Sequence, residues 1–133
     1  MAGFTFAYSL SGTAPLIERF PIKNTVVLSE GEMCNLESGE VDSGAAADTA
    51  LLGACLEAVD NTADGLYAHV IVNEDAVYSV VDANARTKGD LIDLASGALG
   101  LTTDSSHTFI VVETKAAAAD LTLVTFNATH YLD

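Results

Sequence analysis

Basic residues are scarce in this chain of 133 residues, which has 5 Lys and Arg against 19 Asp and Glu and a formal net charge of −14. Nucleic-acid phosphates and anionic lipid headgroups are bound mainly through Lys and Arg. The charge therefore argues against direct binding to nucleic acid or to an anionic membrane surface. Tryptophan is absent too, so the chain lacks the side chain on which sugars most often stack.

Long hydrophobic runs are also missing. No stretch approaches the ~18 consecutive apolar residues of a membrane-spanning helix. The first eighteen residues contain no Lys or Arg, whereas a secretory signal begins with a positively charged region. We therefore expect the protein to be made in the cytoplasm, with no membrane partner.

Cysteine is limited to Cys34 and Cys55, and no CxxC motif is present. Two cysteines do not make a zinc site alone, and the three histidines, His69, His107 and His130, are scattered along the chain. Unpaired cysteine behaves as a small hydrophobic residue. We predict two buried free thiols, and neither a metal nor another cofactor.

Catalytic motifs are not recognisable. The segment Asp60–Gly65 begins like a calcium-binding loop, but its twelfth position is Ile71 where an EF-hand requires a bidentate acid. Ser106 and His107 are residue types of a hydrolase triad, next to Asp104 and Ser105, without a G-x-S-x-G turn. We expect no catalytic residue and no enzymatic activity; a small hydrolase using Ser106 or His107 is the enzymatic alternative.

Half of the residues are hydrophobic and only 18% are charged, which indicates a folded domain. Several short runs rich in β-branched residues are bounded by Gly, Asn or Asp: 25–28, 67–72, 77–81, 109–112 and 121–126. About ten such strands with turn signals between them predict an all-β fold, a small barrel or sandwich.

The sequence contains an internal duplication. Residues 31–41 (GEMCNLESGEV) align with 89–99 (GDLIDLASGAL) at an offset of 58, and residues 48–57 align with 104–113 at an offset of 56. Taken alone, the segment around Leu51 and Cys55 has helical spacing. Its counterpart carries Phe109–Val112, a β-branched run typical of a buried strand. If both copies share one fold, the first is a strand as well.

The N-terminal segment differs in charge from the rest. Residues 1–24 carry a net charge of +1 and both prolines, whereas the other 109 residues carry −15. Proline favours extended backbone that leaves a sheet. This pattern predicts an extended N-terminal arm over 1–24 before a β-barrel or sandwich domain over 25–133. The arm would bind a partner through Phe4, Phe6, Tyr8, Leu10, Arg19 and Lys23. The alternative is that residues 4–10 form the first strand of the barrel.

Short motifs resemble the small head decoration, or capsid cement, proteins of tailed bacteriophages. They are the Gly-acid turns at Gly31 and Gly89, the strand Leu51-Leu52-Gly53, and Tyr78 followed by Asp82-Ala83-Asn84-Ala85-Arg86. The likeness covers about residues 25–115. It implies a β-rich virion protein on the outer surface of the capsid, which binds and stabilises the lattice of the major capsid protein, commonly as a homo-trimer. It also implies that an N-terminal segment contacts the shell and that there are no catalytic residues. The alternative in this class is another self-assembling virion protein, such as a tail or fibre subunit.

Overall fold

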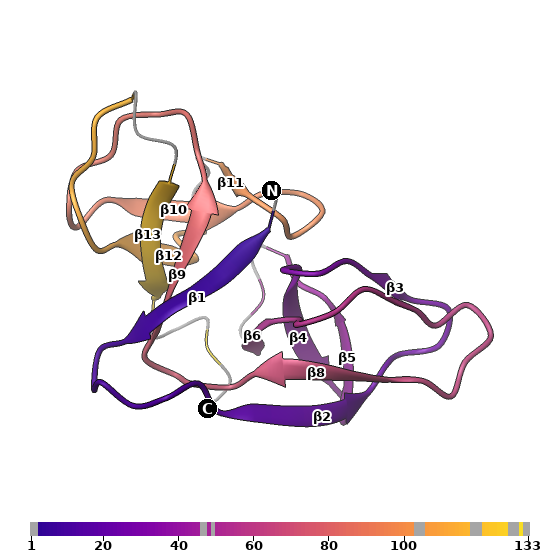
Figure 1. Cartoon of the computed structure of the whole chain (residues 1–133). Coiled ribbons are helices and arrows are strands. Elements are labelled where there is room, and N and C mark those ends of the chain that lie inside the picture. The colour runs from indigo at the N-terminus through magenta and orange to yellow at the C-terminus, as the bar shows by residue number, and fades with distance from the viewer. Residues whose placement is uncertain are drawn as a thin grey trace.

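The chain is an all-β protein. The computed structural model describes residues 3–45, 48, 50–102, 106–117, 121–127 and 131, and this part holds thirteen strands and no helix (Figure 1). No described element is therefore a helix that could span a membrane. The strands are β1 (Phe4–Ser9), β2 (Ile17–Pro21), β3 (Val27–Leu28), β4 (Met33–Glu37), β5 (Glu40–Ser43), β6 (Leu51–Ala54), β7 (Val59–Asp60), β8 (Tyr67–Ile71), β9 (Ala76–Val81), β10 (Leu91–Leu94), β11 (Leu101–Thr102), β12 (Phe109–Val111) and β13 (Leu121–Phe126).

These strands form one large sheet and three small ones. The six-stranded sheet has the order β1-β9-β13-β12-β10-β11, and the three-stranded sheet has the order β5-β4-β6. The pairs β2-β8 and β3-β7 complete the fold, and all of these strand pairs are antiparallel. Figure 1 shows the large sheet to the upper left of the smaller ones. The expected all-β, sandwich-like fold is confirmed.

Two hydrophobic clusters hold the sheets together. The larger one lies between the six-stranded sheet and β4 and β6, and Tyr78 is its largest fully buried side chain. The Tyr78 ring meets Phe4, Phe6 and Phe126 edge-on, an arrangement that aromatic pairs favour. The smaller cluster joins β4, β5, β6 and β8 and includes both cysteines. Through this cluster β8 packs against the three-stranded sheet, and β2, its partner strand, lies at the surface.

The internal duplication is present in the strand register. In the first copy β4 pairs with β6, with Met33 opposite Ala54 and Cys34 opposite Gly53. In the second copy β10 pairs with β12 with Leu91 opposite Ile110 and Ile92 opposite Phe109. These four pairs keep the sequence offsets of 58 and 56. The strand predicted at Leu51–Ala54 is confirmed, against its helical spacing, and all four of its residues are buried.

The turn at the start of each copy has the same pair of hydrogen bonds. The N–H of Ser29 donates to the Glu32 carboxylate at 3.1 Å, and the N–H of Thr87 donates to the Asp90 carboxylate at 2.8 Å. In both turns the N–H of the acid donates back to the carbonyl of the first residue, at 3.1 and 2.9 Å. The third residue is Gly31 or Gly89, with φ of 80° and 92°, which glycine adopts without strain.

The two copies differ in what lies beside them. In the second copy β12 also pairs with β13, so that copy belongs to the six-stranded sheet. In the first copy β6 has β4 as its only strand neighbour among the described strands, so that copy remains a sheet of its own. The duplicated unit is thus used once as a free sheet and once as the edge of a larger one.

The N-terminal segment is integrated into the fold. Of the two alternatives for residues 4–10, the structure gives the strand: β1 pairs with β9 along its whole length, not as an arm that leaves the domain. The physical reason is Phe4, which is 2% exposed and packs its ring 5.4 Å from that of Phe109. Farther along, β2 pairs with β8 and ends at Pro21. Residues 1–24 and 25–133 are therefore not separate in the described part of the chain.

Candidate interaction surfaces

The aromatic residues expected to bind a partner divide into buried and exposed groups. Phe4 lies in the larger core, and Phe6 packs against it. A β-bulge between Phe6 and Tyr8 then shifts the register, and Tyr8 lies opposite Val77. Tyr8 and Leu10, at 39% and 60% exposure, remain at the surface. Of these four residues, Tyr8 and Leu10 are exposed and Phe6 is partly exposed, so these three are available to a partner.

The two basic residues of the segment have different surroundings. Lys23 Nζ lies 3.6 Å from Glu37 Oε1 and 3.7 Å from Asp42 Oδ2, so its charge is paired within the chain. The guanidinium carbon of Arg19 lies 4.4 Å from the centroid of the Tyr67 ring. Stacking of this kind holds the Arg19 side chain flat while its N–H groups stay accessible.

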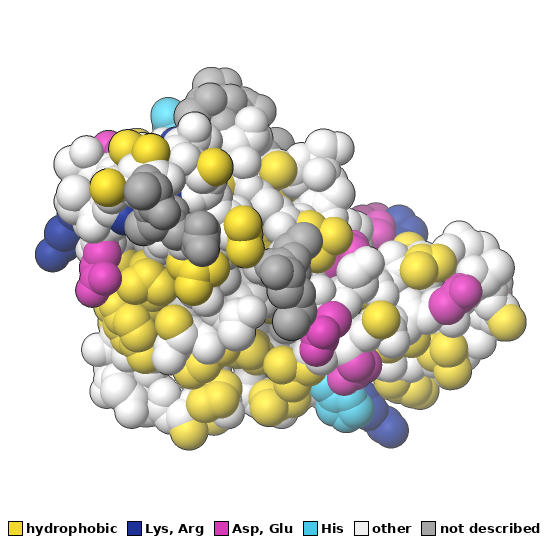
Figure 2. Space-filling view, turned by 45° about the horizontal axis from the view of Figure 1, so that its top comes forward, with side chains coloured by type: hydrophobic (Ala, Val, Ile, Leu, Met, Phe, Trp, Pro, Cys, Tyr) yellow, Lys and Arg dark blue, Asp and Glu magenta, His cyan; other side chains and the backbone are white. Residues whose placement is uncertain are grey.

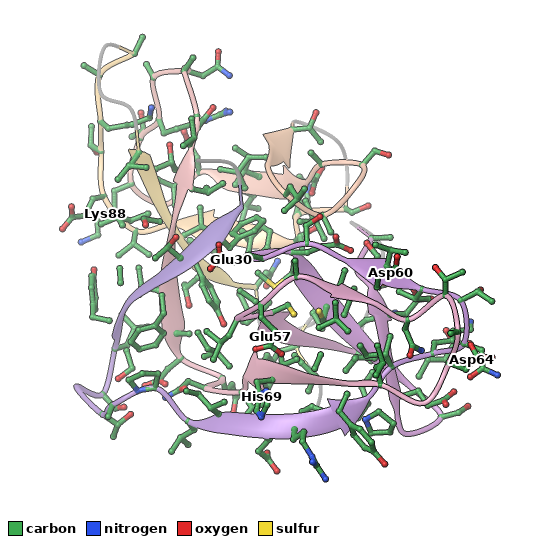
Figure 3. The ribbon with its side chains drawn as sticks, turned by 45° about the vertical axis from the view of Figure 1, so that its right-hand side comes forward. Glu30, Glu57, Asp60, Asp64, His69 and Lys88 are labelled. Carbon is green, nitrogen blue, oxygen red and sulfur yellow. The ribbon has the colours of Figure 1, made fainter. Side chains whose placement is uncertain are left out.

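Arg19 belongs to an exposed surface that we call the β2–β8 face, formed by Ile17, Arg19, Tyr67 and His69. Arg19 lies opposite His69 in the register, and all four residues are exposed. Glu57 Oε1 accepts a hydrogen bond from the backbone N–H of His69 at 2.8 Å, and it lies 3.3 Å from His69 Nδ1. Figure 3 shows the two side chains side by side. Because Arg and Tyr contribute most to protein interfaces when buried there, this face is suited to binding another protein.

A groove continues from the β2–β8 face along the free edge of β1. It has a volume of about 380 Å³ and is bordered by Phe6, Pro15, Ile17 and Leu56 among others. Glu30 is the only charged residue in its lining. The groove and the face share Ile17, so they form one surface that is largely apolar.

Tyr67 and the groove were not among the predicted site residues. The sequence does mark Tyr67 as the first residue of a β-branched run. Its contact with Arg19, however, depends on the pairing of β2 with β8, which lie far apart in the chain. A register of this kind is set by tertiary packing and has no local sequence signal.

The acidic turn at Asp60 uses its carboxylates in local hydrogen bonds. Asp60 Oδ1 accepts from both the N–H and the hydroxyl of Thr62, and Asp64 Oδ1 accepts from the N–H of Thr25 at 3.0 Å. Figure 3 shows Asp60 and Asp64 in the same outer part of the molecule, away from the larger sheet. Among the residues that the structure describes, no three His, Cys, Asp or Glu side chains are grouped to hold a metal.

The Ser-His segment is only partly described. His107 is exposed, has a left-handed φ of 58°, and accepts a hydrogen bond at its backbone oxygen from Asn127. Asp104, Ser105 and His130 lie outside the described residues. Within the described part, Ser106 and His107 are adjacent residues of one segment that leads into β12.

Both cysteines are buried free thiols, as predicted. Cys34 Sγ donates to the Glu32 carbonyl at 3.5 Å, and Cys55 Sγ donates to the Glu57 carbonyl at 2.9 Å. The neighbouring thiol of Cys55 and burial in the smaller core raise the pKa of Cys34 well above its ordinary value. The native protein therefore keeps Cys34 in its unreactive thiol form.

Comparison with known proteins gives a likeness in structure alone. No protein-family model matches the chain, and no curated protein matches it in sequence. The chain is similar to the crystal structure of the head fiber gp8.5 N base of bacteriophage phi29, with a TM-score of 0.56 and 15% sequence identity. The match covers 86% of this chain and 98% of that one, so the likeness extends over most of the fold.

Proposed function

We propose that this chain is a structural protein of a phage virion that decorates the outer surface of the head. It binds the exterior of the mature capsid, stabilises the lattice of the major capsid protein and catalyses no reaction. The observation that carries this proposal is the likeness to the phi29 head fiber base, which extends over 98% of that chain. The motifs that resemble phage decoration proteins support it independently.

The capsid contact in this proposal is the β2–β8 face together with the groove beside β1. The face combines the stacked pair of Arg19 and Tyr67 with the exposed apolar side chain of Ile17. The β2 half of this face belongs to residues 1–24, which carry a net charge of +1. Elsewhere the acidic surface keeps free copies soluble and apart from DNA.

Co-sedimentation tests this proposal. Purified protein is mixed with DNA-filled capsids that lack it, from a tailed phage of its source, and pelleted over a range of concentrations. We expect saturable pelleting at a fixed ratio to the major capsid protein, and capsids that resist heat better once bound. Absence of pelleting at every salt concentration would refute capsid decoration.

Two substitutions locate the contact. Arg19→Ala and Tyr67→Ala each remove half of the stacked pair, and we expect each to weaken binding at least ~10-fold, as for an interface hot spot. Val27→Ala is the control because Val27 is also exposed, at 56%, but lies on β3, outside this surface. Unchanged binding of both variants would place the capsid contact elsewhere.

A head-fibre base is the second candidate, and the identity of the similar structure favours it. The two functions differ in how many sites on the head are occupied. Negative-stain electron microscopy of reconstituted heads separates them: a decoration protein adds a uniform layer, whereas a fibre base occupies a limited set of sites from which fibres project.

A further inference from the structure

The strand β1 is an edge of the six-stranded sheet, and part of its backbone faces away from that sheet. The N–H of Phe4 donates to the Gly31 carbonyl at 2.8 Å, on the side away from β9. Backbone groups of successive strand residues point to alternate sides, so the N–H and C=O of Phe6 face the same way as those of Phe4. No described strand pairs with β1 on this side. Phe6 therefore presents one donor and one acceptor with which a further strand could pair.

The groove beside β1 lies on this same side of the strand. Its lining includes Phe4, Thr5 and Phe6, and it includes Gly31, which marks the side that the Phe6 backbone faces. The volume of about 380 Å³ is at the lower end of the range for ligand sites, ~300–1,000 Å³. The groove thus admits a few side chains of a partner and not a whole folded element.

The lining contributed by other elements is mostly apolar. It includes Pro15, Ile17 and Leu56, of which Ile17 and Leu56 are 49% and 37% exposed. Figure 2 shows a broad hydrophobic area at the left of the molecule, where Figure 1 places β1, and most acidic side chains in that view lie farther right. Apolar side chains of an inserted segment would be removed from water against this lining, which favours their binding.

A single charge borders the groove. Glu30 is exposed and is the only charged residue of the lining. None of the ion pairs among the described residues involves it. A partner lying in the groove would therefore meet an unpaired carboxylate beside Gly31. Charge complementarity favours Lys or Arg over Asp or Glu at that point of the partner.

We propose that the groove takes an extended segment of the major capsid protein, which adds a short strand to the free edge of β1. The segment pairs its backbone with the N–H and C=O of Phe6 and carries a Lys or Arg beside Glu30. Its apolar side chains pack against Pro15, Ile17 and Leu56. Main-chain hydrogen bonds then supply affinity and the groove supplies specificity, as in other complexes in which a peptide extends a sheet. This inference rests on the proposed function, which makes the capsid protein the partner.

The added strand is short because the edge of β1 is limited at both ends. At one end Phe4 is already bonded to Gly31, and at the other a β-bulge shifts the register between Phe6 and Tyr8. The new hydrogen bonds are therefore centred on Phe6 alone. Short edges and bulges also hinder indiscriminate pairing with other chains. This edge can thus stay open in the free protein until the capsid segment binds.

Hydrogen exchange of the Phe6 amide tests the added strand in the full chain. Free protein and protein bound to DNA-filled capsids of the source phage are labelled in D2O and read residue by residue by mass spectrometry. We expect the Phe6 N–H to exchange rapidly in the free chain and at least ~10-fold more slowly on capsids. The N–H of Thr5, which faces β9, is the internal reference and should be protected in both states.

The possible results separate this inference from the proposed function. Capsid binding without protection of the Phe6 N–H would overturn the added strand and leave capsid decoration in place. Protection of Phe6 in the free chain would overturn it too, because the edge would then be closed without a capsid. If the chain does not bind capsids at all, the proposed function is refuted and this inference with it.

Reversing the charge of Glu30 tests the basic residue of the segment. Glu30→Lys should weaken capsid binding at least ~10-fold in co-sedimentation, because two like charges would meet in the groove. Glu113→Lys is the matched control: it makes the same change in net charge at an exposed position after β12 and should bind like the unmodified chain. Circular dichroism checks the folding of both variants. Equal binding by the two variants would refute a Lys or Arg beside Glu30.

Discussion

The hydroxyl of Tyr78 accepts a hydrogen bond from the backbone N–H of Ala54 at 3.3 Å, across the core between the six-stranded and three-stranded sheets. Gly53, next to Ala54, leaves the space for this ring, because a Cβ there would lie 2.5 Å from the Tyr78 oxygen and would overlap the Ile71 carbonyl. Burial raises the pKa of Tyr78 well above its ordinary value, so the hydroxyl stays protonated. The three-stranded and six-stranded sheets are thus joined at a point where only glycine fits.

Gly53→Ala should destabilise the protein by more than about 3 kcal/mol, because it combines overpacking with an unfavourable φ of 154°. The free energy of unfolding in urea measures the loss. Gly12→Ala is the control: φ is 80° and nothing lies within 4 Å of the added Cβ, so the cost should be about 1 kcal/mol. Equal losses in the two variants would contradict the close approach at Gly53.

The two equivalent turns should respond differently to the same substitution. Gly89→Ala places its Cβ in open space and should cost about 1 kcal/mol for the positive φ alone. At Gly31 the Cβ would lie 3.0 Å from the backbone N of Phe4 and 3.1 Å from Gly3 Cα, so Gly31→Ala should cost at least about 1 kcal/mol more. Matching urea midpoints for the two variants would show that β1 does not pack on this turn.

Asp82 should make stability depend on pH in the acid range. Burial raises the pKa of Asp82, but hydrogen bonds from Arg86 and Thr122 outweigh it and lower the pKa to about 2. The folded-state pKa is depressed, so the stabilisation is complete above the unfolded pKa of 3.8 and is lost as pH falls through about 2. The shift corresponds to about 2 kcal/mol.

Unfolding free energies between pH 5 and pH 2 check this. The unmodified chain should lose about 2 kcal/mol more over this range than Asp82→Asn, which has no carboxylate to protonate. Glu113→Gln, at an exposed position, should keep the pH dependence of the unmodified chain. Parallel pH profiles for Asp82→Asn and the unmodified chain would show that Asp82 is not held in its charged form.

The two thiols should be unreactive in the native protein. Cys34 and Cys55 are 0% and 1% exposed, so Ellman's reagent reaches them only after local or global opening. We expect no labelling within minutes in buffer and two thiols per chain in 6 M guanidinium chloride. Rapid labelling of one thiol in buffer would mean that the groove beside β1, which Cys55 borders, opens to the sulfur.

The sequence predicted the strands correctly where the internal duplication supplied two copies to compare. It was ambiguous where only the local pattern of apolar residues was available. The strand at Leu51–Ala54 has helical spacing of its own, and only the comparison with Phe109–Val112 predicted it correctly. The alternation in Phe4–Leu10 suits both an internal strand and an arm that binds elsewhere, because it defines one apolar side and not what that side contacts. That β1 lies beside β9 depends on the fit of Phe4 between Tyr78 and Phe109, which no local pattern contains.

The residues of the interaction surfaces could likewise be predicted only in part from the sequence. Arg19 was predicted as a binding residue from its charge in a non-acidic segment, and the structure does leave it exposed. Lys23, selected on the same ground, is paired with Glu37 and Asp42, which lie on β4 and on β5. Composition distinguishes a basic residue from its surroundings, whereas the fold decides which acids come within reach of it.

The position of β13 has a consequence for synthesis. Residues 121–126 lie between β9 and β12, so during translation the pair β1-β9 and the unit β12-β10-β11 stay apart until residue 126 has left the ribosome. Until then the edges of β9 and β12 are unpaired, a condition that favours pairing with other nascent chains. Nascent chains stalled before residue 121 should therefore depend on chaperones, and emergence of residues 121–126 should be the step that completes the large sheet.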